Sequence, residues 1–293
     1  MNDKRPSKVL TLAISLLLLL SGCSGSVKNV KIAGKFGNAL ANQPITSATA
    51  EVSCDVILRE QEEEEILGFR TVVNSKADWN GQRTYSDITS SMDGFGSQII
   101  QTMQCYGDLR DGDMARYVHV DNADLWLRLE TQKRISDVDP RLIMGLLETV
   151  SQNTEMEIRE NPGSGSTHYV LRLTFHGSDI LEFAENADMR LSPEMKAVDL
   201  SGVTLPVEVE LEDKTFLPVK VLIQLKGINR SLINVLADAF AKGNEVRGLN
   251  VEIGEISLLI THFGYEPQNV PMLPMGAAEN ALDMRKVKEI QNH

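Results

Sequence analysis

The chain has 293 residues, with 29 Lys and Arg against 41 Asp and Glu, and a net charge of −12 at pH 7. This acidic balance argues against a nucleic-acid partner and against docking onto anionic headgroups by a basic patch. The length is sufficient for a substantial core, in one large domain or two small ones.

The chain begins with a short positive leader and an uncharged run. Lys4, Arg5 and Lys8 precede or flank residues 9–20, which contain no charged side chain. A helix of twelve residues spans roughly 18 Å, which is short of the ~30 Å hydrocarbon core of a bilayer. Residues 1–22 are therefore predicted to be a signal peptide rather than a membrane-spanning helix.

The run ends in Leu20, Ser21, Gly22 and Cys23. A leucine and two small residues before a cysteine resemble the lipobox of bacterial lipoproteins. The resemblance implies cleavage between Gly22 and Cys23 and attachment of a diacylglycerol to the Cys23 thiol. An ordinary secretory signal with an incidental cysteine is the alternative.

The lipobox predicts a protein on the extracytoplasmic face of a bacterial membrane, held there by its N-terminal lipid. In a host with two membranes, Ser24 after the cysteine resembles an outer-membrane sorting signal; in a host with one, the protein faces outward from the cell membrane. The mature chain has 26 basic and 40 acidic side chains, a net charge of −14.

Residues 23–46 are predicted to be a lipid-attached tether with a weak helix. Apolar residues recur at three- or four-residue spacing from Val30 to Leu40, Gly34 and Gly37 weaken the pattern, and Pro44 ends it. Residues 47–270 follow as one domain, and 271–293 as a C-terminal tail.

The domain is rich in strands. Period-two alternation and turn residues predict strands over 48–58, 66–73, 82–90, 97–106, 114–120, 124–131, 155–160, 167–176, 203–211, 216–226 and 249–262. In several of them one face is apolar and the other polar, as in an antiparallel sheet with one wet face. Val219, Val221, Ile223 and Leu225 are one such apolar face. The apolar phase shifts by one residue near Gly254, which predicts a bulge or bend there.

Helices are predicted between the strands. The first begins at Asp139-Pro140 and runs to about Gln152, with an apolar stripe that includes Leu146 and Val150. Others are predicted over 178–188, 192–201 and 231–242, the last with Leu236 and Phe240 on its inner side.

Two cysteines remain in the domain. Cys54 and Cys105 lie in predicted strands, and an exported protein can oxidise them. They either form a disulfide or are two small buried side chains without a bond.

Few residues suggest catalysis or metal binding. The histidines lack helical zinc spacing, and there is no CxxC or GxSxG motif. The acidic run at 60–65 lacks the spacing of a calcium loop and is better explained as a solvated turn. His168, Arg172 and His176 share one strand face, either around a pocket or on the wet side of the sheet. We expect no enzyme, cofactor or metal.

Three segments resemble a known family. Residues 111–117 and 124–127, residues 207–220, and residues 260–271 are similar to hairpins and to the closing segment of the LolA/LolB/LprG-like (LppX-like) lipoproteins, including secreted Firmicute lipoproteins. The resemblance implies an α+β fold: a curved antiparallel half-barrel with helices packed on its concave face.

The family holds acyl chains or whole lipids between sheet and helices. By this resemblance we expect a non-catalytic, membrane-anchored protein that binds an apolar ligand in a cavity lined by Leu146, Val150, Leu171, Leu173, Val221, Ile223, Leu236 and Phe240. The alternative is that these side chains fill the core, and that the protein is a structural or regulatory surface lipoprotein with a protein partner.

Overall fold

The computed structural model describes residues 29–60, 63–108, 114–131, 140–152, 156–162, 167–177, 202–225 and 249–283. The predicted signal peptide, with the predicted lipobox and Cys23, lies outside these ranges. So do the helices predicted after residue 177, with Leu236 and Phe240. Among the described segments, no helix is both long and apolar enough to cross a bilayer.

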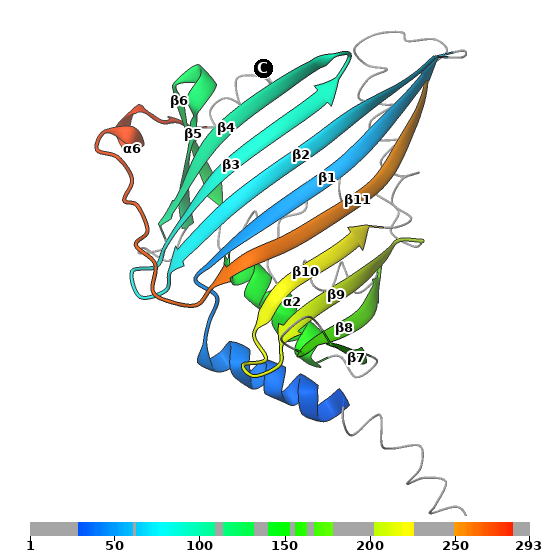
Figure 1. Ribbon diagram of the computed structural model, residues 1–293. Coiled ribbons are helices and arrows are strands. Elements are labelled where there is room, and N and C mark those ends of the chain that lie inside the picture. Colours follow the sequence, from blue (N-terminus) through cyan, green and yellow to red (C-terminus); the bar gives the residue numbers. More distant parts are fainter. Residues whose placement is uncertain are drawn as a thin grey trace, which may run out of the picture.

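One twelve-stranded sheet dominates the fold (Figure 1). Its spatial order is β12-β6-β5-β4-β3-β2-β1-β11-β10-β9-β8-β7, antiparallel except for the pair β12 and β6. The strands are β1 (Ser47–Glu60), β2 (Glu63–Asp78), β3 (Arg83–Gly94), β4 (Ser97–Asp108), β5 (Met114–Val120), β6 (Leu125–Thr131), β7 (Glu157–Pro162), β8 (Thr167–His176), β9 (Thr204–Glu212), β10 (Pro218–Leu225), β11 (Leu249–Gly264) and β12 (Leu282–Asp283).

The predicted α+β half-barrel with helices packed on the concave face is wrong as a description of this fold. The described chain is mostly one large, open, curled sheet with few helices: residues 29–42, η1 (Asp121–Ala123), α2 (Pro140–Gln152) and the single turn α6 (Ala277–Asn280). Strands β1–β4 are 12–16 residues long and pair with their neighbours in sequence. Such hairpins build a wide sheet without helical crossovers.

The two faces of the sheet differ in chemistry. We call the face that contacts α2 the inner face and the opposite one the outer face. Residues directly opposite each other in adjacent strands lie on the same face. One inner-face row crosses eleven strands, and every member is apolar: Ile158, Leu171, Val209, Val221, Ile260, Ala50, Val73, Ile88, Met103, Val120 and Leu125.

The main core lies at one side of this inner face. The α2 side chains Ile143, Leu147 and Val150 are at most 2% exposed and pack in one cluster with residues of β8–β11. Phe36 and Leu40 of the helix over 29–42 belong to the same cluster. This helix is therefore part of the folded body, and it occupies much of the segment predicted to be a tether with a weak helix.

Two irregularities shape the centre of the sheet. Between the pairs Cys54/Ile256 and Val56/Ile253 the register shifts, so that Gly254 and Glu255 lie opposite the single residue Asp55. The predicted bulge at Gly254 is confirmed. A second shift at the start of β10 leaves Val219 39% exposed, so Val219 does not share the buried face predicted for it with Val221.

The C-terminal segment crosses the outer face. Val270 and Leu273 pack on an aromatic cluster that includes Tyr85, Tyr106 and Trp126. Beyond α6, β12 pairs with β6. The first half of the predicted tail, up to residue 283, is thus bound to the sheet.

Candidate functional site

The inner face of β1–β4 carries no charge over most of its length. None of the described inner-face positions in residues 48–58, 67–77, 84–94 and 97–107 is Asp, Glu, Lys or Arg. The outer face of the same strands has paired charges, such as Arg70 with both Glu51 oxygens at 2.7 Å. Arg70 lowers the pKa of Glu51 by hydrogen bonding. The inner face also holds uncharged polar side chains such as Thr71, Ser90 and Gln101, so the asymmetry between the two faces is one of charge.

Six of the eight residues predicted to line a cavity come together, but as packed core. Val150, Leu171, Leu173, Val221 and Ile223 are at most 8% exposed, and Leu146 is half-buried against them. These side chains meet α2 and the helix over 29–42 directly. This part of the inner face is filled by side chains of the described core. Leu236 and Phe240 lie outside the described residues.

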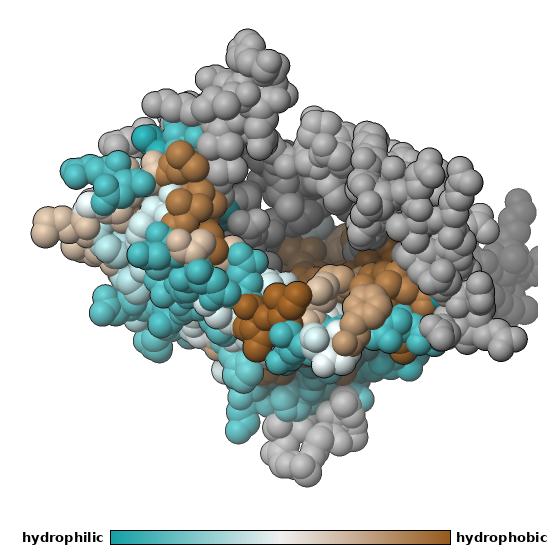
Figure 2. Space-filling model, turned by 90° about the horizontal axis from the view of Figure 1, so that it is seen from above, coloured by the Kyte–Doolittle hydropathy of each residue, from teal (hydrophilic) through white to brown (hydrophobic). Residues whose placement is uncertain are grey.

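The same face is open further along the sheet. A second row runs through Ile256, Cys54, Phe69, Met92 and Ile99. Phe69 is 38% exposed and Ile99 59%, while Cys54 and Met92 are half-buried. We call these five residues the open row. Seen from above, hydrophilic residues follow the outer side of the curved wall and hydrophobic ones gather toward the hollow (Figure 2).

The open row was missed by sequence reasoning. Its strands were predicted, but whether an apolar residue is covered depends on where the helices pack. The available signal was weak: β1–β4 have more inner-face apolar positions than α2 alone can cover.

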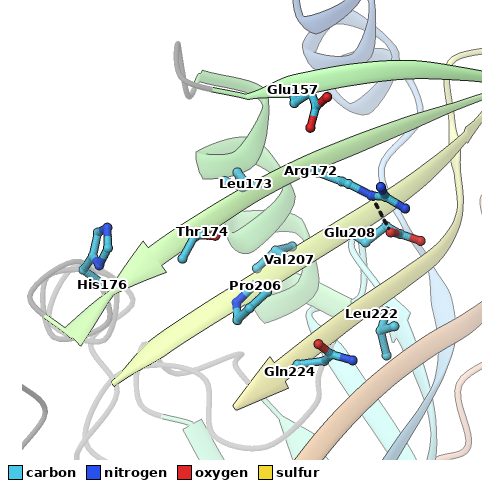
Figure 3. Close-up of a pocket in the computed structure, with 10 residues that line it drawn as sticks. All are labelled: Glu157, Arg172, Leu173, Thr174, His176, Pro206, Val207, Glu208, Leu222 and Gln224. Carbon is cyan, nitrogen blue, oxygen red and sulfur yellow. Dashed lines mark hydrogen bonds and ion pairs between the residues drawn. The ribbon is translucent and has the colours of Figure 1, made fainter. Parts of the chain in front are cut away.

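A recess of about 490 Å³ lies over β7–β10 on the other face of the sheet (Figure 3). Its side chains include Arg172, whose Nε donates to Glu208 Oε2 at 2.8 Å, and the polar Thr174, His176 and Gln224. His168 shares the outer face of β8 with Arg172 and His176, as predicted, and approaches Glu210 at 3.5 Å. Leu173, Pro206, Val207 and Leu222 also line the recess, so its wall is mixed, whereas a site for an acyl chain is lined predominantly by apolar side chains.

Cys54 and Cys105 are not joined by a disulfide. Cys54 lies on β1 and Cys105 on β4, with β2 and β3 between them. Three strand spacings of about 4.8 Å separate β1 from β4 by roughly 14 Å, whereas the Cα atoms of a disulfide lie within about 7 Å of each other. Burial, and then the Asp55 carboxylate, raise the pKa of the Cys54 thiol.

The described side chains contain no group of three or more His, Cys, Asp or Glu arranged to hold a metal ion. His119 lies between Asp121 at 2.9 Å and Asp124 at 3.2 Å and stacks on Trp126 at the β5–β6 turn. These contacts hold a hairpin end together.

Comparison with known proteins finds distant likeness in structure alone. No family model and no curated protein matches the chain. A DUF1329 family protein from Desulfovibrio piger is 12% identical, with 83% of this chain and 93% of that one covered and a TM-score of 0.24. An outer membrane lipoprotein-sorting protein domain from Vibrio parahaemolyticus is 9% identical, with 87% and 98% covered and a TM-score of 0.24. A β-barrel-like DUF1849 protein from Brucella abortus is 7% identical, with 76% and 99% covered and a TM-score of 0.26.

Proposed function

We propose that this protein is a non-catalytic lipoprotein that holds an acyl chain or lipid against the open part of its inner face. It is anchored through Cys23 on the extracytoplasmic side of a bacterial membrane. The observation that carries the proposal is the open row: large apolar side chains, exposed on an uncharged face, beside a part of the same face that is already packed.

Apolar burial can supply the binding energy. Each methylene removed from water contributes about 0.8 kcal/mol, and exposed apolar surface is covered by whatever apolar partner is available. Met92 adds a flexible, polarisable side chain that adapts to ligand shape. Binding by apolar contact needs no bond-making step.

Two adjacent isoleucines on β4 give a matched test. Ile99 is on the inner face and is 59% exposed, whereas Ile100 is on the outer face and is 50% exposed. Ile99→Glu places a carboxylate in the open row and is expected to weaken binding of a fluorescent fatty acid at least about tenfold. Ile100→Glu makes the same change outside the site and is expected to leave binding unchanged. Equal effects of the two substitutions would refute the site.

Cys54 supplies a second readout that needs no labelled ligand. It lies in the open row beside Phe69. A bound acyl chain is expected to slow alkylation of the Cys54 thiol in the folded protein. The reaction of Cys105, which is 7% exposed, serves as the reference for unfolding.

Native mass spectrometry of the protein purified from its host decides between the two functions. Co-purified acyl species support lipid binding. If no acyl species is present and no fatty acid binds, lipid binding at the open row is refuted, and a role in binding a protein partner is favoured.

The anchor has its own test. Cys23→Ala is expected to release the protein from the membrane or to leave the precursor uncleaved. Unchanged labelling by a radioactive fatty acid would contradict lipidation at Cys23.

A further inference from the structure

The N-terminal segment has the opposite charge from the rest of the chain. Between Ser24 and Ala50 there are three lysines, Lys28, Lys31 and Lys35, and no Asp or Glu. The first acidic residue of the mature chain is Glu51. All 40 acidic residues that remain after cleavage therefore lie beyond this segment. The segment is positively charged although the whole chain is negatively charged.

The fold directs this charge outward. The helix over 29–42 buries Ile32, Phe36 and Leu40, which recur every four residues, at no more than 5% exposure. Lys31 and Lys35 are exposed. Lys35 Nζ also lies 4.4 Å from the centre of the Phe216 ring, so this helix is held on the β9–β10 turn.

The same helix is the described element nearest in sequence to the anchor. Six residue steps separate Cys23 from residue 29, a reach of about 20 Å when fully extended. From the other end of this helix the chain enters β1, which runs about 43 Å to the acidic run at 60–65. The basic helix is thus kept close to the lipid, and that acidic run begins a full strand length further along the chain.

We propose that the exposed lysine face of the helix over 29–42 lies on anionic phospholipid headgroups and orients the sheet on the membrane. This inference rests on the proposed anchorage through Cys23. A lysine near an anionic surface contributes about 1 kcal/mol, which is a factor of about five. Lys31 and Lys35 together favour the docked orientation by about 25-fold before opposing charge is counted.

Amide hydrogen exchange on the lipidated, full mature chain tests the proposal. The protein is reconstituted in phosphatidylcholine vesicles, with or without 30 mol% phosphatidylglycerol, and exchange is followed in residues 29–42. We expect exchange at least about fivefold slower in the anionic vesicles at low salt. The difference should disappear at 0.5 M salt, because salt screens charges beyond a few ångströms.

Charge reversal supplies the matched variants. Lys31→Glu/Lys35→Glu is expected to abolish the difference between vesicles. Lys220→Glu, with the same change of sign on the outer face of β10, is expected to retain it. Circular dichroism confirms that each variant is folded.

The outcomes separate this inference from the anchor. Protein that floats with both kinds of vesicle but shows equal exchange overturns the lysine contact and leaves anchorage intact. Equal protection in pure phosphatidylcholine also overturns it, since contact would then need no charge. Protein that floats with neither overturns both.

Discussion

The helix over 29–42 can be shown to belong to the folded body by removing one side chain. Phe36 is fully buried in the cluster that joins this helix to α2 and the sheet. A buried phenylalanine removes about 150–250 Å² from water, worth roughly 4–6 kcal/mol at 25 cal/mol per Å², and Phe→Ala changes in cores cost about 3–5 kcal/mol. We expect Phe36→Ala to lower the free energy of unfolding by about 4 kcal/mol.

Urea unfolding followed by fluorescence and circular dichroism measures this loss. In a domain of about 200 residues it corresponds to a fall in Tm of about 8–16 °C. Asn38→Ala, on the exposed side of the same helix, is the control and should stay within about 0.5 kcal/mol of the parent. A loss below about 1 kcal/mol for Phe36→Ala would mean that residues 29–42 are a detachable tether, as the sequence suggested.

Three further results are expected. An added Cβ at Gly254 would lie 3.2 Å from the backbone oxygen of Asp55, so Gly254→Ala should cost about 1–3 kcal/mol in urea unfolding, whereas Gly34→Ala, with open space in a helix, should add about 0.5–1 kcal/mol. The Tyr265 hydroxyl donates to the Pro218 carbonyl at 2.7 Å, and burial, then Glu212, raise the pKa of Tyr265 above 10. The stabilising contribution of Tyr265 should therefore be fully present below pH about 10 and be lost as the pH rises above it. Tyr265→Phe should reduce this fall of the unfolding free energy by up to about 1.4 kcal/mol per pH unit. An unchanged slope would contradict the raised pKa of Tyr265. Reductant should not alter Tm, and both Cys54 and Cys105 should alkylate after unfolding without reduction; a mass consistent with a bridge would contradict the strand order.

The strands could be predicted because the alternation of apolar and polar residues is visible within each strand. Alternation in residues 167–176 and 203–211 reports a sheet with one buried face, and β8 and β9 follow it. The bulge at Gly254 was visible for the same reason, since a one-residue slip changes which side chains face the core. Local chemistry also placed the start of α2 at Pro140.

The sequence did not predict which apolar side chains of the inner face are covered by helices, because such contacts join residues far apart in the chain. Leu171 and Phe69 are both apolar inner-face residues, yet one is fully buried and the other is 38% exposed. The difference is the position of α2 and of the helix over 29–42, whose stripe is interrupted by glycines and gave only a weak signal. Tertiary packing stabilises the helix over 29–42 and also determines which part of the inner face it covers.

This division of the inner face links the proposed anchor to the proposed site. The helix over 29–42 and α2 pack in one core cluster with residues of β8–β11 and with Ala48 and Ala50 of β1. The open row lies further along the same face, outside this cluster. The helix that follows the proposed anchor in sequence thus also covers one side of the inner face. A change such as Phe36→Ala that loosens this helix would open a second apolar area, so fatty-acid binding should weaken less than stability does. Parallel loss of both would mean that the open row binds its ligand only while this helix is packed, and stronger binding would mean that ligand and helix compete for one surface.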